Sequence, residues 1–384
     1  VTKASRMATS AATLAEDVMA ALAEATGGRP GPVHLSVPSD VLDAPCEAHP
    51  LPNFRFERET IEERVALAAL ETLSLAARPL IVTGPAALHG DGSRRMRALE
   101  EATGVPVIAM ESPRGVNDPS LGRLAKILKR ADAVLLLGKR RDYTLQFGRA
   151  FAPECRVLEA ARDVDGLIAR AKRRTGPSEW RDEVRESLAY RPPEWAGLRS
   201  MPGGPVHPVE LCREVSCLLD TSSGILVCDG GEFGQWAQAC LDAPRRLING
   251  TAGAIGSALP FAAAAKLALP ESRVVAMMGD GTFGFHMSEI DTAARYGLSY
   301  LAVIGNDSCW NAEHQIQLRA YGPERAVGCE LLPTRYGAAA AALGAFGEDV
   351  LTSAGLGDAL GRAAASGRPA CVNVLIERLP APRY

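Results

Sequence analysis

The chain has 384 residues, of which 47% are hydrophobic and 23% charged, and it carries a formal net charge of −3. That length exceeds what one hydrophobic core usually holds, so we expect two or three domains. The composition is that of a globular protein, with neither the basic stripe of a nucleic-acid-binding protein nor an apolar run long enough to span a membrane.

The first 45 residues predict a helix followed by a short strand. Apolar residues recur at helical spacing over residues 10–25, and a Gly/Pro turn leads to a strand over residues 33–37. A strand needs neighbours in a sheet, and no element is predicted ahead of this helix. We therefore interpret residues 1–45 as the C-terminal remnant of a domain whose front is absent or supplied elsewhere. The proline-rich residues 41–60 are expected to act as a linker.

Residues 55–175 predict a second unit. Buried strands are expected in "PLIVTG", "VPVIAM" and "ADAVLLLG", and a helix in "MRALEEATG" is expected to stop at its glycine. Strands that alternate with helices imply a parallel, doubly wound sheet. The charged, Pro/Gly-rich residues 176–205 are predicted to form a second linker.

Residues 206–384 repeat this alternation. Strands are expected in "GILVC", "RVVAMMG", "SYLAVIG" and "ACVNVLIE", and helices in "GSALPFAAAAKLAL" and "HMSEIDTAARYG". The predicted fold class is therefore α/β, with two doubly wound, mostly parallel domains plus the remnant of a third.

Three predicted strands of the last unit end in polar or glycine-rich loops. These are Asp229-Gly230-Gly231-Glu232, Gly279-Asp280-Gly281 and Gly305-Asn306-Asp307. Ligands of open parallel sheets bind outside the carboxyl ends of the strands. Asp280 and Asp307 are 27 residues apart, about one βαβ crossover, so they reach the same crevice if their strands are neighbours.

Two carboxylates in one crevice repel each other unless a divalent cation relieves the charge. Mg²⁺ prefers such oxygen ligands and usually completes its shell with phosphate oxygens and water, and glycines let backbone N–H groups approach an anion. The pattern favours a metal-bridged diphosphate site. The competing interpretation is that Asp280 is only a turn residue and helix N-cap.

The segment from Gly279 to Asp307, an acidic G-D-G followed by "GND", resembles the diphosphate/Mg²⁺ motif of thiamine-diphosphate-dependent enzymes. "GTAGAIGSALPFAAAAKLAL" is similar to the start of the helix before that motif, "TGGRPGPVHLSVPSDV" to the end of the pyrimidine-binding domain, and "LLLGKRRDYTLQFG" to the central domain. Within the family the chain looks most like the acetolactate synthase branch, which includes benzaldehyde lyase and 2-hydroxyacyl-CoA lyases.

The resemblance implies roles for individual residues. Asp280 and Asp307 would be side-chain Mg²⁺ ligands, and Cys309 would offer its backbone carbonyl. Asp307 departs from the family's second asparagine, which adds negative charge and should tighten the metal or raise its pH sensitivity. Ile255 matches the apolar residue that bends the cofactor. The implied cofactor contacts are Gly230, Gly231, Glu232, Gly253, Ala254, Ile255, Gly279, Gly281, Thr282 and Asn306.

The catalytic residues are less defined. The family's proton-relay glutamate lies in the pyrimidine-binding domain, and no residue here matches it, so the chain looks truncated or split. His286 and His314 are candidates for substrate contact or proton transfer. The glycines from Gly250 to Gly256 also allow a dinucleotide loop, although their spacing disagrees. FAD in the central domain is conceivable from the resemblance, but no motif requires it.

The resemblance implies a thiamine-diphosphate- and Mg²⁺-dependent carboligase, lyase or decarboxylase that acts on 2-keto acids or other small carbonyl substrates. The alternatives are a non-catalytic cofactor-binding subunit that needs a partner chain and an unrelated nucleotide-dependent oxidoreductase. A homodimer or homotetramer is expected for the intact protein. Nine scattered cysteines without C-x-x-C spacing favour reduced thiols and a cytoplasmic location.

Overall fold

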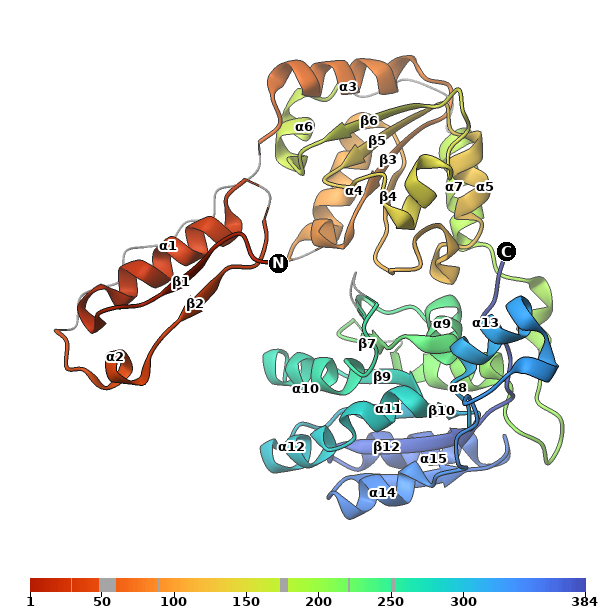
Figure 1. Ribbon diagram of the computed structural model, residues 1–384. Helices are drawn as coiled ribbons and strands as arrows, with labels where there is room; N and C mark the ends of the chain where they lie inside the picture. The colour runs from red at the N-terminus through yellow and green to blue at the C-terminus, as the bar shows by residue number, and fades with distance from the viewer. Residues whose placement is uncertain (29, 48–59, 89, 173–178, 220–221, 250–252) are drawn as a thin grey trace.

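The computed structural model describes residues 1–384 except 29, 48–59, 89, 173–178, 220–221 and 250–252 (Figure 1). At the N-terminus, strands β1 (Ser5–Met7) and β2 (His34–Ser36) pair in parallel, and helix α1 (Leu14–Thr26) connects them along the chain. Strand β1 corrects the expectation that nothing precedes the helix; it was missed because three residues are too short for a periodic signal. A short helix, α2 (Ser39–Asp43), follows.

The middle unit is a four-stranded parallel sheet in the order β4-β3-β5-β6. Its strands are β3 (Pro79–Thr83), β4 (Val107–Ala109), β5 (Ala133–Leu137) and β6 (Arg156–Ala160). Its helices are α3 (Glu63–Leu75), α4 (Gly92–Thr103), α5 (Leu124–Arg130), α6 (Val164–Arg170) and α7 (Glu179–Ala189). Each face of the sheet carries its own apolar core, which explains why β3 and β5 are apolar at nearly every position.

Helix α7 lies inside the segment predicted to be a linker. Trp180 and Val184 of this helix are buried in the core of the middle sheet, and the Trp180 indole donates a hydrogen bond of 2.9 Å to the Pro79 carbonyl. The linker prediction over 176–205 is therefore wrong for residues 179–189. The helix was not predicted because Trp180 and Val184 are a single apolar pair at i, i+4 spacing within a charged segment that is flanked by Pro and Gly residues.

The C-terminal unit is a six-stranded parallel sheet in the order β11-β12-β10-β9-β7-β8. Its strands are β7 (Ile225–Cys228), β8 (Arg245–Ile248), β9 (Val274–Gly279), β10 (Leu301–Asn306), β11 (Phe346–Val350) and β12 (Ala370–Leu375). Its helices are α8 (Pro208–Leu219), α9 (Gly231–Cys240), α10 (Ala258–Ala268), α11 (Asp280–His286), α12 (Glu289–Tyr296), α13 (Asn311–Tyr321), α14 (Tyr336–Ala342) and α15 (Leu356–Ala365).

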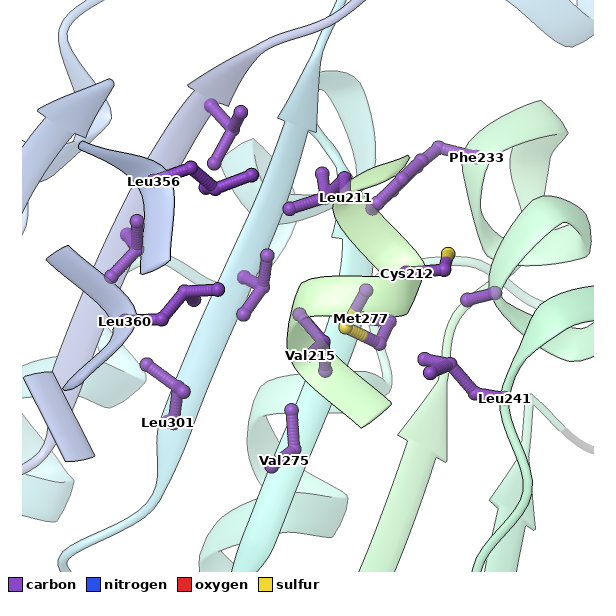
Figure 2. Close-up of a cluster of buried hydrophobic side chains, with 14 of the residues drawn as sticks. Leu211, Cys212, Val215, Phe233, Leu241, Val275, Met277, Leu301, Leu356 and Leu360 are labelled. Carbon is purple, nitrogen blue, oxygen red and sulfur yellow. The ribbon is translucent and has the colours of Figure 1, made fainter. Parts of the chain in front are cut away.

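Helices cover both faces of this sheet. Side chains of α8, α9 and α15 form one core, and those of α10, α12 and α14 form the other. Figure 2 shows the first core, where Leu211 and Val215 of α8 and Leu360 of α15 lie over Met277 and Leu301 of the sheet. A fully buried leucine contributes roughly 2 kcal/mol, so these contacts fix β9 and β10 firmly.

The predicted α/β class with two parallel-sheet units is confirmed. Strands β6, β8 and β11 were not predicted, because all three are edge strands whose partly exposed sequences, RVLEA, RRLI and FGEDV, lack a continuous apolar run. Among the described residues, no helix combines the length and apolar character needed to cross a membrane.

Candidate cofactor site

The two candidate metal ligands emerge from neighbouring strands. Strands β9 and β10 pair in parallel, and Gly279 lies opposite Gly305 in the register. Asp280 and Asp307, which follow shortly after these positions, therefore leave the sheet at the same edge. The strand adjacency on which the metal prediction depended is confirmed. Strand β7, which leads to Asp229, pairs with the other side of β9.

A cavity of about 420 Å³ opens at this edge. Most of the predicted cofactor and metal residues line it: Gly230, Gly231, Glu232, Gly253, Ile255, Gly279, Asp280, Gly281, Thr282, Asp307 and Cys309. Its wall also contains residues of the middle unit, namely Ser112, Pro113, Arg114 and Tyr143. The site is thus assembled from both sheets.

The carboxylates have the properties expected of cation ligands. Asp280 is only 2% exposed, and its Oδ2 atom has no hydrogen-bond partner among the described residues. Burial raises the pKa of Asp280 to about 6, although backbone N–H groups oppose the shift. Burial, and then the charge of Asp280, raise the pKa of Asp307 to about 7. An uncompensated buried oxygen beside a second carboxylate fits a divalent cation.

The set of protein ligands is small. Among the described residues, no group of three or more His, Cys, Asp or Glu side chains is placed to hold a metal. The two carboxylates would therefore need further oxygen ligands from backbone carbonyls, water and a diphosphate, which is the usual environment of Mg²⁺. Burial raises the pKa of the Cys309 thiol to about 12, so its backbone carbonyl is the group suited to this role.

Asp229 organises the cofactor loops, a role that was not predicted. Its side chain is fully buried and accepts hydrogen bonds from the backbone N–H groups of Gly230, Gly256 and Ala258, at 2.7 to 3.1 Å. Asp229 thereby ties the loop after β7 to the loop that contains Ile255. The only signal in the sequence was a carboxylate at the end of a buried strand.

Asn306 supports the candidate metal loop, residues 306–309, through its side-chain amide. Its side-chain nitrogen donates to the Thr334 carbonyl and to Asn373 Oδ1, and its side-chain oxygen accepts from the backbone N–H and hydroxyl of Ser308. These contacts occupy the amide, and Asn306 is not among the described residues that line the cavity. The structure thus shows Asn306 in a supporting role, its direct contact with a cofactor stays a prediction, and Ala254 likewise lies outside the described lining.

Comparison with known proteins agrees with this geometry. Residues 229–374 match the model of the thiamine pyrophosphate enzyme C-terminal TPP-binding domain. The chain is 34% identical to a probable acetolactate synthase of Mycobacterium bovis over 79% of its own length and 60% of the relative. It is 31% identical to human 2-hydroxyacyl-CoA lyase 2, over 80% of the chain and 55% of the relative. Residues 229–374 belong to the family of thiamine pyrophosphate enzyme C-terminal domains, and the chain is similar to acetolactate synthase-like members of that family.

The chain spans about three fifths of the length of these curated relatives. The matched region begins at Asp229 and includes both carboxylates of the cavity. The family assignment and the site therefore rest on the same part of the chain, the six-stranded sheet and its loops.

The two candidate histidines lie outside the cavity wall as the structure describes it. His286 Nδ1 lies 2.7 Å from the Gly256 carbonyl, to which it donates, and so holds the loop beside Ile255. His314 lies on α13, and its Nδ1 atom is buried without a described hydrogen-bond partner. Neither position supports direct contact with a bound ligand, so the structure favours a loop-holding role for His286 and assigns none to His314.

Gly281 is required by the close approach of Trp310. A Cβ atom at residue 281 would lie 2.6 Å from the Trp310 ring, and this ring also packs edge-on against Phe285 at 5.9 Å. We expect Gly281→Ala to lower the free energy of unfolding by about 1–3 kcal/mol through overpacking, as measured by denaturant titration.

Gly284→Ala is the matched control for this prediction. Gly284 lies on the same helix, and a Cβ atom added there would meet no other atom within 4 Å. Both changes gain the same helix propensity, so the difference between them isolates the clash with Trp310. Equal stability of the two variants would contradict the assignment.

Proposed function

We propose that this chain binds thiamine diphosphate with Mg²⁺, and that the complete protein is a carboligase, lyase or decarboxylase acting on 2-keto acids or similar small carbonyl substrates. The observation that carries the proposal is the unpaired buried oxygen of Asp280 beside Asp307, at the carboxyl edge of a parallel sheet. The family membership of residues 229–374 supports the choice of cofactor.

The residues have distinct roles in this proposal. Asp280, Asp307 and the Cys309 carbonyl would hold the cation, and the glycines around Asp280 and after Asp229 would let backbone N–H groups approach the diphosphate. The Thr282 hydroxyl donates a hydrogen bond of 2.9 Å to the Gly279 carbonyl, and the lone pairs of its oxygen stay available to accept a further hydrogen bond. When bound, the cofactor supplies the carbanion chemistry. Ile255 and the loop held by Asp229 would fix the shape of the bound group.

A non-catalytic binding role for this chain alone has its own support. The described cavity wall contains four acidic side chains, Glu232, Asp280, Asp307 and Glu313, and no histidine. Two of these acids are assigned to the cation, and Glu232 accepts the backbone N–H of Ala381. In this alternative, a different chain that contains the pyrimidine-binding domain supplies the proton-transfer group.

Calorimetric titration tests the proposal directly. We expect thiamine diphosphate to bind the 384-residue chain only when Mg²⁺ is present, since the carboxylates repel a diphosphate without it. A parallel assay of pyruvate consumption separates the two versions: binding with turnover supports the enzyme, and binding without turnover supports the subunit. Absence of binding at millimolar cofactor and Mg²⁺ would overturn both.

A further inference from the structure

The C-terminal segment, residues 376–384, runs along the metal loop. The Ile376 N–H donates to the Asn306 carbonyl at 2.9 Å, and the Asn311 side chain donates to the Leu379 carbonyl at 2.9 Å. Asn311 also lines the cavity. This segment is therefore attached to the site at several points.

Arg378 makes the most direct of these contacts. Its Nε and Nη2 atoms donate to the Asp307 carbonyl at 3.2 and 3.0 Å, and Nη2 also donates to the Ser308 carbonyl at 3.2 Å. On its outer side the guanidinium is held by Glu330, at 2.7 and 2.9 Å. A planar guanidinium fixed by a carboxylate is a rigid support for the two carbonyls.

The turn that Arg378 supports is conformationally demanding. Ser308 has a φ of 52°, in the left-handed region that residues other than glycine rarely adopt. Such a residue persists only where its surroundings hold it. The Asn306 side chain holds it from one side, the Leu331 N–H binds the Ser308 carbonyl at 2.8 Å, and Arg378 completes the support.

We propose that Arg378 is a positioning residue that holds the Asp307–Cys309 turn in the geometry needed to bind the cation. This inference rests on the proposed Mg²⁺ site and goes beyond it, because Arg378 does not line the described cavity wall. Arg378 acts on the backbone of a ligand residue, and groups that orient ligands in this way typically change metal affinity by about 10–100-fold when removed.

Charge and positioning make opposite predictions for this residue. Arg378 is a cation that touches the backbone of Asp307, so its charge alone disfavours a bound Mg²⁺. Arg378 also lowers the pKa of Asp307, which lies at about 7, so the comparison is made at a pH well above that value, where Asp307 is ionised in every variant. There, if charge dominated, removing Arg378 would tighten metal binding. If positioning dominates, removing it weakens metal binding in spite of the lost repulsion. The direction of the change therefore identifies the role.

The test is calorimetric titration of Mg²⁺ into the 384-residue chain with saturating thiamine diphosphate, for the unchanged protein, Arg378→Met and Arg378→Lys. We expect about 10-fold weaker Mg²⁺ binding for Arg378→Met and an intermediate loss for Arg378→Lys, which keeps the charge but not the fork. Circular dichroism checks the fold, and Arg378→Lys carries the test if the methionine variant does not fold.

Arg362→Met is the matched control. Arg362 forms a similar forked pair with Glu348, and neither residue lines the described cavity wall. Its Mg²⁺ affinity is expected to equal that of the unchanged protein. Unaltered or tighter binding by both Arg378 variants would overturn the positioning role alone, whereas an unchanged protein that binds no Mg²⁺ with the cofactor would overturn the proposed function as well.

Discussion

Replacing Asp280 with alanine is expected to abolish the Mg²⁺-dependent binding of thiamine diphosphate. The Asp280 side chain is buried, and one of its oxygens has no described partner in the protein, so a cation is the group that would satisfy it. Loss of a direct ligand should cost more than the ~10–100-fold typical of supporting residues. Calorimetric titration of the cofactor with and without Mg²⁺ measures this loss.

Asp291→Ala is the control for this variant. Asp291 lies on α12, and its exposed carboxylate pairs with Arg295 at 2.9 Å. A surface pair of this kind contributes little to stability, so both cofactor binding and folding should be retained. If Asp280→Ala and Asp291→Ala bind the cofactor with the same affinity, Asp280 is not a metal ligand.

Metal affinity is expected to fall steeply as the pH is lowered. The pKa of Asp307 is raised to about 7 and that of Asp280 to about 6, in each case by burial first. Metal binding requires both carboxyl groups to be deprotonated. Each pH unit below the pKa of a ligand lowers the deprotonated fraction of that ligand about tenfold. Between about pH 8 and pH 5.5, Mg²⁺ affinity should fall roughly 100-fold, measured by titration at each pH.

The free energy of unfolding of the metal-free protein should depend on pH with the opposite sign. Both folded-state pKa values lie above the ordinary value of 3.8, so the stability contributed by these groups is present at low pH and is lost as pH rises through about 6 and 7. The Asp307→Asn variant removes the titration of Asp307 alone. It should still bind Mg²⁺, but its Mg²⁺ affinity should no longer change with pH near pH 7. An unchanged pH profile in the Asp307→Asn variant would contradict this account.

Much of the fold follows from local patterns. Strands β9 and β10 are continuous apolar runs between glycine-containing loops, so their existence and the carboxylates that follow them could be predicted. Strand β8 could not, because an edge strand with two arginines carries no such pattern. Helix α7 was hidden for a related reason: its burial depends on Trp180 finding the Pro79 carbonyl, a contact between residues 101 positions apart.

The residues of the site likewise fall into those that could be predicted from the sequence and those that could not. Asp280 and Asp307 could be paired from sequence because one crossover separates them, and the register of β9 and β10 then brings them together. Asp229 ends a buried strand, yet its use as a hydrogen-bond hub depends on a loop that returns to it. Arg378 lies 71 residues from Asp307, and nothing in its local sequence distinguishes it from other surface arginines.

The wall that Ser112, Arg114 and Tyr143 add to the cavity comes from a different sheet than the one carrying the carboxylates. Arg114 is the only cationic side chain on the described wall. Substitutions in these two loops, which follow β4 and β5, are therefore expected to alter which molecules the cavity admits while the loops that carry Asp280 and Asp307 stay intact. Selectivity and cofactor chemistry can thus diverge independently in descendants of this fold.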